Sequence, residues 1–168
     1  MRCGTPGQPG VWLFIEVLEQ MFLGQYVHAI DDKGRLTVPS RYREALAGGA
    51  YISQGFERNL MVQTVPAFEN ITRRVSSMSI TDPTSRQLKR LIFATADYVE
   101  LDSAGRIRIP QFLRDLAGLE GEAVIVGVGD YIEIWSPIAW TPQADLIHDV
   151  EANNQRFSAL DLSGQGST

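Results

Sequence analysis

The chain carries the motif DDKGRLTVP at residues 31–39 and repeats it as DSAGRIRIP at residues 102–110. The match continues outside the motif at the same spacing, since Arg43 corresponds to Arg114 and Pro66 to Pro137. A register this long indicates a duplicated unit. Because a unit of roughly 40–50 residues is too small to bury an adequate core alone, we expect the two copies to pack on each other.

Each copy predicts two strands, a short helix and two further strands. In the first unit, a polar turn joins strands at 26–30 and 36–38, which predicts a hairpin. Pro39 ends the second strand, and Ser40 is expected to cap a helix at 41–46. The other predicted elements are strands at 50–54, 59–65, 98–101, 106–109, 123–128 and 131–135, and a helix at 111–117 that Gly118 ends. The predicted fold class is α+β, mainly β, with tandem ββαββ-like units.

Helices are expected to connect the units and to follow the second one. One runs from Pro66 to about Ser76, and the next is capped by Asp82 with Pro83 in its first turn. A further helix is predicted at about 141–152. We expect an N-terminal extension from an upstream start (1–20), a first unit (21–68), a helical connector (69–95), a second unit (96–140), and a C-terminal helix with a disordered tail (141–168).

Composition limits the function classes. The net charge of -5 argues against an anionic partner, yet the windows 31–43 and 102–114 each carry two more basic than acidic residues. Cys3 is the only cysteine, which excludes an intrachain disulfide and suits a reducing cytosol. No transmembrane segment, metal-ligand spacing or nucleophile–base pattern is present in the sequence, so we expect neither an enzyme nor a cofactor.

The repeated Asp-x-x-Gly-Arg turn combines three chemical properties. Gly34 and Gly105 permit a positive φ, the aspartate can accept turn amides, and the arginine projects a guanidinium from the next strand. One interpretation is purely structural, with aspartate and arginine pairing only to pin the two hairpins together. The duplication favours a functional role, because both copies retain the whole combination.

The segments MFLGQY at 21–26 and IDDKGRLTVP at 30–39, together with the second motif, closely resemble the MraZ family of bacterial transcriptional regulators. The resemblance covers about residues 21–136. It implies two AbrB-like swapped-hairpin units that form one pseudo-twofold, β-barrel-like body. It also implies assembly into rings that bind direct repeats in the promoter of the operon for cell division and cell-wall synthesis. The family's Asp-x-x-x-Arg motif falls on Asp31 with Arg35 and on Asp102 with Arg106.

A hairpin or two-stranded ribbon is slim enough to enter the major groove of DNA, where arginine can reach guanine or phosphate. We expect Arg35 to make the leading contact and Lys33 to neutralise phosphate. The second loop lacks a lysine, so the two loops need not contribute equally. Strand alternation predicts Arg106 and Arg108 on one face, opposite Ile107 and Ile109. The candidate DNA-binding residues are Lys33, Arg35, Arg41, Arg43, Arg106 and Arg108, and the loop-forming residues are Asp31, Gly34, Asp102 and Gly105.

The resulting prediction is a cytoplasmic, nucleoid-associated regulator that binds double-stranded promoter DNA as a homo-oligomeric ring, with no membrane partner. Two alternatives remain open. AbrB-like hairpins also occur in antitoxins, although these usually carry one copy and a tail that folds on its partner. The hairpins could instead serve only a structural oligomer. Phe93, Trp135 and Trp140 are expected in the core or at subunit contacts.

Overall fold

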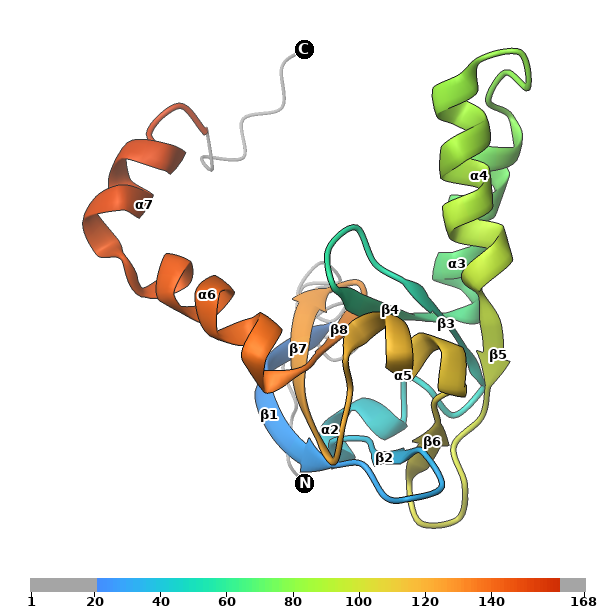
Figure 1. Cartoon of the computed structure of the whole chain (residues 1–168), viewed down its shortest axis with the longest axis vertical. Coiled ribbons are helices and arrows are strands. Elements are labelled where there is room, and N and C mark those ends of the chain that lie inside the picture. The colour runs from blue at the N-terminus through green and yellow to red at the C-terminus, as the bar shows by residue number, and fades with distance from the viewer. Residues whose placement is uncertain (1–20, 161–168) are drawn as a thin grey trace, which may run out of the picture.

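Two copies of a β-β-α-β-β unit form the body of the protein in the computed structural model, which describes residues 21–160 (Figure 1). The first unit contains β1 (Phe22–Ala29), β2 (Arg35–Thr37), α2 (Ser40–Arg43), β3 (Ala50–Gln54) and β4 (Asn59–Thr64). The second contains β5 (Asp97–Val99), β6 (Arg106–Arg108), α5 (Gln111–Ala117), β7 (Glu122–Gly129) and β8 (Ile132–Trp135). The predicted ββαββ order is confirmed. The expected extension at 1–20 and the end of the expected tail lie outside the described residues.

The strands of one unit pair extensively with those of the other. A six-stranded antiparallel sheet has the order β1-β7-β8-β4-β3-β5, and β2 pairs with β6 in a separate two-stranded ribbon. If each strand is replaced by its counterpart in the other unit, the same order is read from the opposite end of the sheet. This is expected for a pseudo-twofold arrangement. The predicted hairpin between 26–30 and 36–38 forms only next to its turn, where an isolated antiparallel bridge joins Ile30 to Leu36, and the strands otherwise pair with the other unit. Pairing with the other unit instead puts Leu36 directly opposite Ile107, so that both are buried.

The predicted barrel is not closed. The large sheet ends at β1 on one side and β5 on the other, and the β2–β6 ribbon is a separate sheet that the Ile30–Leu36 bridge joins to the residue just after β1. Both ribbon strands are only three residues long. Pro39 and Pro110, which follow shortly after them, lack the N–H that further pairing would need. The body is therefore an open sheet and a short ribbon that enclose one core.

The core lies between the sheet, the ribbon and the two short helices. Tyr42 of α2 is almost fully buried, packs edge-on against Phe22, and donates a 2.6 Å hydrogen bond to the carbonyl of Leu23. Its counterpart Leu113 of α5 is fully buried. The main buried side chains of the cluster also include Leu36, Val38, Leu46, Ile52, Leu60, Ile107, Ile109, Ile125 and Ile134.

Truncating a side chain of this core should destabilise the whole body. Leu113→Ala should lower the free energy of unfolding by about 2–5 kcal/mol, because it removes buried apolar surface and leaves a cavity. The control is Leu116→Ala on the same helix, where the leucine is 44% exposed. It should change the free energy of unfolding by less than about 1 kcal/mol. Urea denaturation of both variants checks this, and equal losses would contradict the placement of α5.

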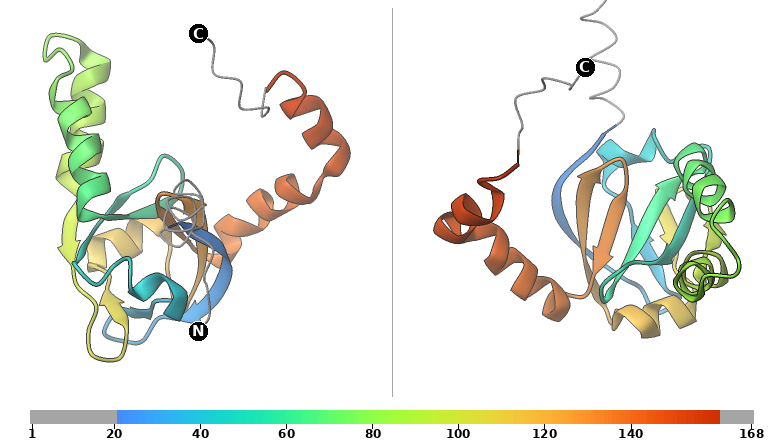
Figure 2. Two further views of the ribbon diagram at one scale, coloured as in Figure 1. Left: turned by 180° about the vertical axis from the view of Figure 1, so that it is seen from behind. Right: turned by 90° about the horizontal axis from the view of Figure 1, so that it is seen from above.

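Two helical arms project from the body (Figures 1 and 2). The first consists of α3 (Val65–Ser76) and α4 (Pro83–Thr95). Asp82 caps α4 as predicted, since its carboxylate accepts from the backbone N–H groups of Thr84 and Ser85. The second arm consists of α6 (Pro137–His148) and α7 (Val150–Phe157). No helix within residues 21–160 is long and apolar enough to cross a membrane.

Some local predictions need correction. The single helix expected at 141–152 is two helices, because Asp149 has a non-helical backbone and its side chain caps α7 through the N–H of Ala152. Ser40 does not cap α2, since it is already the first helical residue and Pro39 stands at the cap position. Trp135 and Trp140 are buried together beside Val124, as expected, whereas Phe93 is 42% exposed, so that only its expected place at a subunit contact stays a prediction.

Candidate nucleic-acid interface

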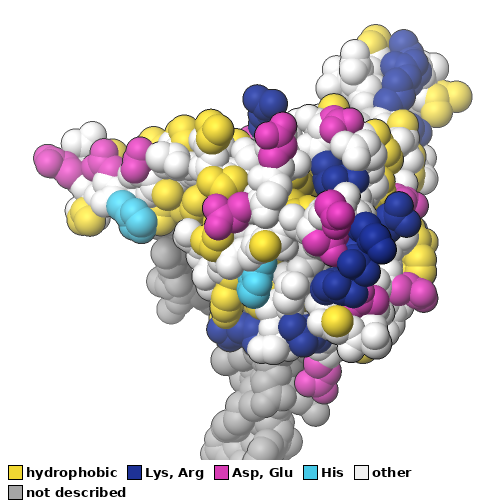
Figure 3. Space-filling model, turned by 60° about the horizontal axis from the view of Figure 1, so that its bottom comes forward, with side chains coloured by type: hydrophobic (Ala, Val, Ile, Leu, Met, Phe, Trp, Pro, Cys, Tyr) yellow, Lys and Arg dark blue, Asp and Glu magenta, His cyan; other side chains and the backbone are white. Residues whose placement is uncertain are grey.

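The two copies of the motif meet in the β2–β6 ribbon. Arg35 lies opposite Arg108 and Thr37 opposite Arg106, while the central pair, Leu36 and Ile107, is buried. Because side chains alternate along a strand, the positions of Arg35, Thr37, Arg106 and Arg108 share the outer face. Figure 3 shows Lys and Arg side chains gathered, with acidic ones among them, at the end of the body that holds these loops. Duplication thus concentrates three guanidinium groups on one narrow ribbon.

The motif aspartates hold the loops from inside. Asp31 Oδ1 accepts from the backbone N–H groups of Lys33 and Arg35 at 3.0 and 2.9 Å, and Oδ2 accepts from Arg35 Nε at 2.7 Å. Asp102 accepts in the same way from Ala104 N at 3.0 Å, Arg106 N at 2.9 Å and Arg106 Nε at 2.8 Å. Each aspartate therefore stabilises the turn through backbone N–H groups and also holds the Nε of one arginine. The side chains of Arg35 and Arg106 remain 32% and 30% exposed.

The turn itself requires glycine. Gly34 and Gly105 have φ values of 76° and 74°, a region that L side chains rarely adopt. Each glycine N–H donates to the carbonyl of its own motif aspartate, at 2.9 Å for Gly34 and 3.0 Å for Gly105. The two loops are therefore copies in three dimensions as well as in sequence.

These hydrogen bonds determine how the loops respond to pH. The backbone N–H of Arg35 contributes most to lowering the pKa of Asp31 below its usual 3.8, with further help from the guanidinium. The backbone N–H of Arg106 has the same leading effect on the pKa of Asp102. A carboxyl group with a lowered folded-state pKa contributes stability above its unfolded pKa and loses it as pH falls through the folded value.

We therefore expect the loops to stay closed from neutral pH down to about 4 and to open only below it. A carboxyl-carbon NMR titration should place the pKa of Asp31 and Asp102 below 3.8. In Arg35→Ala, the pKa of Asp31 should rise only part of the way, because the backbone N–H of residue 35 still donates. An Asp31 carboxyl that titrates above 3.8 in the unmodified protein would contradict this loop geometry.

Charge is distributed unevenly across the ribbon. Asp31 Oδ2 also lies 3.9 Å from a terminal nitrogen of Arg106, so this aspartate forms ion pairs with one arginine from each unit. Arg108 is exposed and makes no side-chain hydrogen bond or ion pair with any described residue. It also stands directly opposite Arg35, and like charges at such a position repel. An anion bound between Arg35 and Arg108 would reduce this repulsion.

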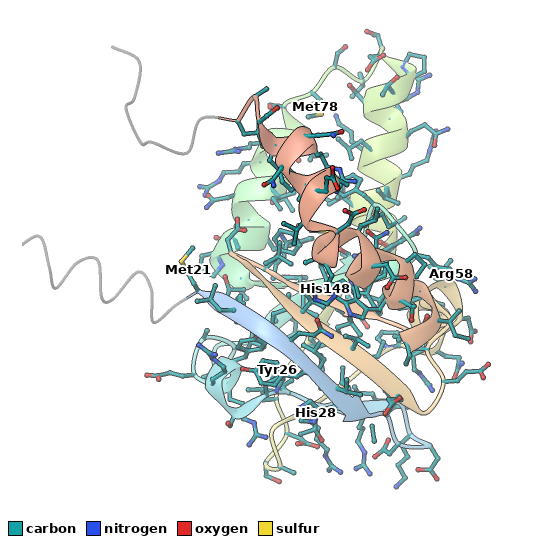
Figure 4. All side chains as sticks on the ribbon, turned by 90° about the vertical axis from the view of Figure 1, so that its left-hand side faces the viewer. Met21, Tyr26, His28, Arg58, Met78 and His148 are labelled. Atoms are coloured by element: carbon teal, nitrogen blue, oxygen red, sulfur yellow. The ribbon has the colours of Figure 1, made fainter. Side chains whose placement is uncertain are left out.

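The remaining sequence candidates lie in two different settings. Lys33 is exposed at the tip of its loop. Arg41 of α2 is exposed and donates to the hydroxyl of Tyr26 on β1 at 3.2 Å; Figure 4 labels Tyr26 on that strand. Arg43 is half-buried, and its Nε donates to the carbonyl of Val38 at 2.9 Å. Its guanidinium therefore lies against the backbone at Val38 and Gly105, next to the ribbon, and is only partly exposed.

Sequence reasoning did not select Arg114 as a site residue. Its Nε donates to the carbonyl of Ile109 at 3.2 Å, which repeats the bond from Arg43 to Val38 in the other unit. The signal was present in the sequence, since Arg43 and Arg114 occupy equivalent positions of the duplication. Among residues 21–160, no group of His, Cys, Asp or Glu side chains is arranged to hold a metal ion.

Comparison with known proteins agrees with the duplicated architecture. The family model described as "MraZ protein, putative antitoxin-like" matches residues 21–91 and again residues 92–161. The chain belongs to the MraZ family. This confirms the resemblance found in the sequence, and the match reaches past residue 136 into the α6–α7 arm.

Named relatives cover most of the chain. The chain is similar to the "Transcriptional regulator MraZ" of Thermomicrobium roseum, with 49% identity over 76% of this chain and 89% of the relative. It is 45% identical to the protein of the same name from Roseiflexus castenholzii, over 82% of this chain and 94% of the relative. MraZ is thus a family of transcriptional regulators and not of enzymes.

Proposed function

We propose that this MraZ protein is a sequence-specific, double-stranded-DNA-binding transcriptional regulator that reads DNA with its β2–β6 ribbon. The observation that carries the proposal is the joint outer face of Arg35, Arg106 and Arg108, which needs both copies of the motif. A two-stranded ribbon fits the major groove, where arginine can donate two hydrogen bonds to guanine O6 and N7.

The roles of individual residues follow from their settings. Arg35 and Arg106 are held at Nε by their aspartates, so their terminal nitrogens are presented in a fixed direction. We assign base contacts to these two residues. Lys33, Arg41 and Arg108 are assigned to phosphates, because they are exposed cations around the ribbon. Asp31 and Asp102 stay with the loops, where each neutralises an arginine instead of facing phosphate.

Self-association is the second part of the proposal. The α3–α4 arm exposes Met78, Ile80 and Phe93, and the α6–α7 arm exposes Ile138, Leu146, Ile147, Val150 and Phe157. Apolar surface of this extent is typical of interaction sites. The arms also differ in charge. Arg74 and Arg90 on the first arm, and Asp145 and Glu151 on the second, are exposed and make no side-chain hydrogen bond or ion pair with a described residue.

We assign each arm of one copy to the opposite arm of the next copy. Because the two surfaces are different, such a contact is head-to-tail, and head-to-tail contacts close into a ring when the rotation between copies permits. A ring would present the ribbon repeatedly to direct repeats in DNA. Linked sites gain affinity through effective concentration, which would compensate for the acidic net charge of each subunit.

The family resemblance gives the target in this proposal as the promoter of the operon for cell division and cell-wall synthesis. A protein that binds this promoter would be found in the cytoplasm, associated with the nucleoid. The test is fluorescence-anisotropy binding to a fragment from upstream of the protein's own gene, against a shuffled fragment of equal composition. We expect preference for the native fragment and a linear fall of log K with log salt concentration. An intact oligomer that binds neither fragment would instead favour the protein-binding, antitoxin-like alternative.

A further inference from the structure

The two units are interlocked beneath the ribbon through a pair of arginines outside the motif. In the first interlock, the N–H of Val38 donates to the carbonyl of Gly105 at 2.9 Å, and Arg43 Nε donates to the carbonyl of Val38 at 2.9 Å. The guanidinium of Arg43 then lies against Gly105, and a Cβ on this residue would displace it. Val38 and Arg43 of the first unit therefore both contact Gly105, in the loop of the second unit, and also bond to each other.

The second interlock repeats the first with the units exchanged. Ile109 N–H donates to the carbonyl of Gly34 at 2.8 Å, and Arg114 Nε donates to the carbonyl of Ile109 at 3.2 Å. A Cβ atom on Gly34 would lie 2.7 Å from Arg114 Cζ. Arg114 also donates to the side chain of Gln111 at 2.6 Å. Thus, α2 of the first unit packs through Arg43 on the motif loop of the second, and α5 of the second unit packs through Arg114 on the motif loop of the first.

The glycines are therefore constrained twice. Their positive φ already disfavours any other residue, and a Cβ at either position would displace the guanidinium that packs against it. Arg43 and Arg114 are both half-buried and donate to backbone carbonyls. This differs from Arg108, which is exposed on the ribbon and makes no side-chain bond to a described residue.

We infer that Arg43 and Arg114 are positioning residues that join the two motif loops into one rigid DNA-reading unit, each arginine holding the loop of the opposite unit. The interlock itself can be tested without DNA. Its effect on DNA binding rests on the function proposed above. Arg43 was predicted from the sequence to contact DNA directly. Here it affects DNA binding only by holding the loop at Gly105.

Amide hydrogen exchange tests the crossed pattern directly, on the full chain. Arg114→Ala should speed exchange in the loop at 31–35 by roughly five- to tenfold, about the effect of one lost hydrogen bond, and leave the loop at 102–106 unchanged. Arg43→Ala should do the reverse. The control Arg108→Ala should leave both loops unchanged. Faster exchange only in the loop of the mutated unit, or in neither loop, would overturn the inference.

Conservative variants keep the test decisive if an alanine variant does not fold. Arg43→Lys and Arg114→Lys retain the charge and the apolar stem but lack the planar guanidinium with its Nε–H donor. They should give the same crossed pattern of exchange with a smaller amplitude, in proteins whose circular dichroism spectra match that of the unmodified chain. Lysine variants whose loops exchange as slowly as those of the unmodified protein would contradict a role for the guanidinium.

DNA binding supplies a readout that separates positioning from direct contact. Arg114→Ala should weaken binding roughly five- to tenfold while the slope of log K against log salt stays unchanged. Arg108→Ala should reduce that slope by about one, as expected for a lost phosphate contact. A reduced slope in Arg114→Ala with unchanged loops would identify Arg114 as a phosphate contact instead. If the unmodified protein binds no DNA, the proposed function fails, and the exchange pattern still decides the interlock.

Discussion

Arg35→Ala should weaken binding to the promoter fragment by about 1–3 kcal/mol per ribbon, the usual value of one bidentate arginine–guanine contact. The Nε of Arg35 is occupied by Asp31 at 2.7 Å, so the alanine variant removes two terminal nitrogens that are already oriented. Asp31 would also lose a partner and become a carboxylate facing the DNA. In an oligomer, every subunit loses the contact, so the total loss should exceed that of one ribbon.

The matched control is Arg58→Ala, which removes the same charge from an exposed position between β3 and β4 (Figure 4). It should alter affinity only slightly, because Arg58 lies outside the ribbon. Fluorescence anisotropy gives the affinities, and light scattering of each variant verifies that assembly is unchanged. Equal losses in the two variants would mean that only net charge matters. Loss of assembly in Arg35→Ala would return the motif to a purely structural role.

Reversing charge on one helical arm should dissociate the oligomer. The double variant Arg74→Glu/Arg90→Glu would place like charges against Asp145 and Glu151 of the next copy, and such juxtapositions cost several kcal/mol at an interface. With the ring lost, a single ribbon would bind without the gain from linked sites. Affinity for DNA with several repeats should then fall by about 10²–10⁴-fold.

The complementary double variant, Asp145→Arg/Glu151→Arg, should dissociate for the same reason. A mixture of the two variants should reassemble, because the acidic α3–α4 arm of one would meet the basic α6–α7 arm of the other. Light scattering of each variant alone and of the mixture measures this. Reversed variants that remain assembled, or a mixture that stays dissociated, would contradict the arm-to-arm contact.

The sequence predicted the order of elements and most of their bounds because the relevant signals are local. Asp82 caps α4 and Pro83 is its first residue, and Gly118 ends α5 in a left-handed conformation. The alternation of Arg106, Ile107 and Arg108 correctly predicted which side of β6 is buried. These features depend on residues a few positions apart, so one chain without its fold contains them.

The strand partners could not be predicted in this way. A polar turn between 26–30 and 36–38 fits a local hairpin, but the choice between that hairpin and pairing with β7 and β6 depends on segments far apart in the chain. The same distance conceals the role of Arg43 and Arg114, whose targets lie in the opposite unit. The duplication marks both arginines as equivalent, whereas only the fold reveals what each one holds.

The proposed function requires the β2–β6 ribbon to contact the bases of DNA. The most direct measurement is the structure of the full oligomer bound to a promoter duplex that contains its direct repeats. We expect the ribbon in the major groove, with terminal nitrogens of Arg35 and Arg106 at base edges and Lys33 at a phosphate. DNA seated on a helical arm or on the outer face of the sheet, with the ribbon facing solvent, would show that the ribbon does not read DNA.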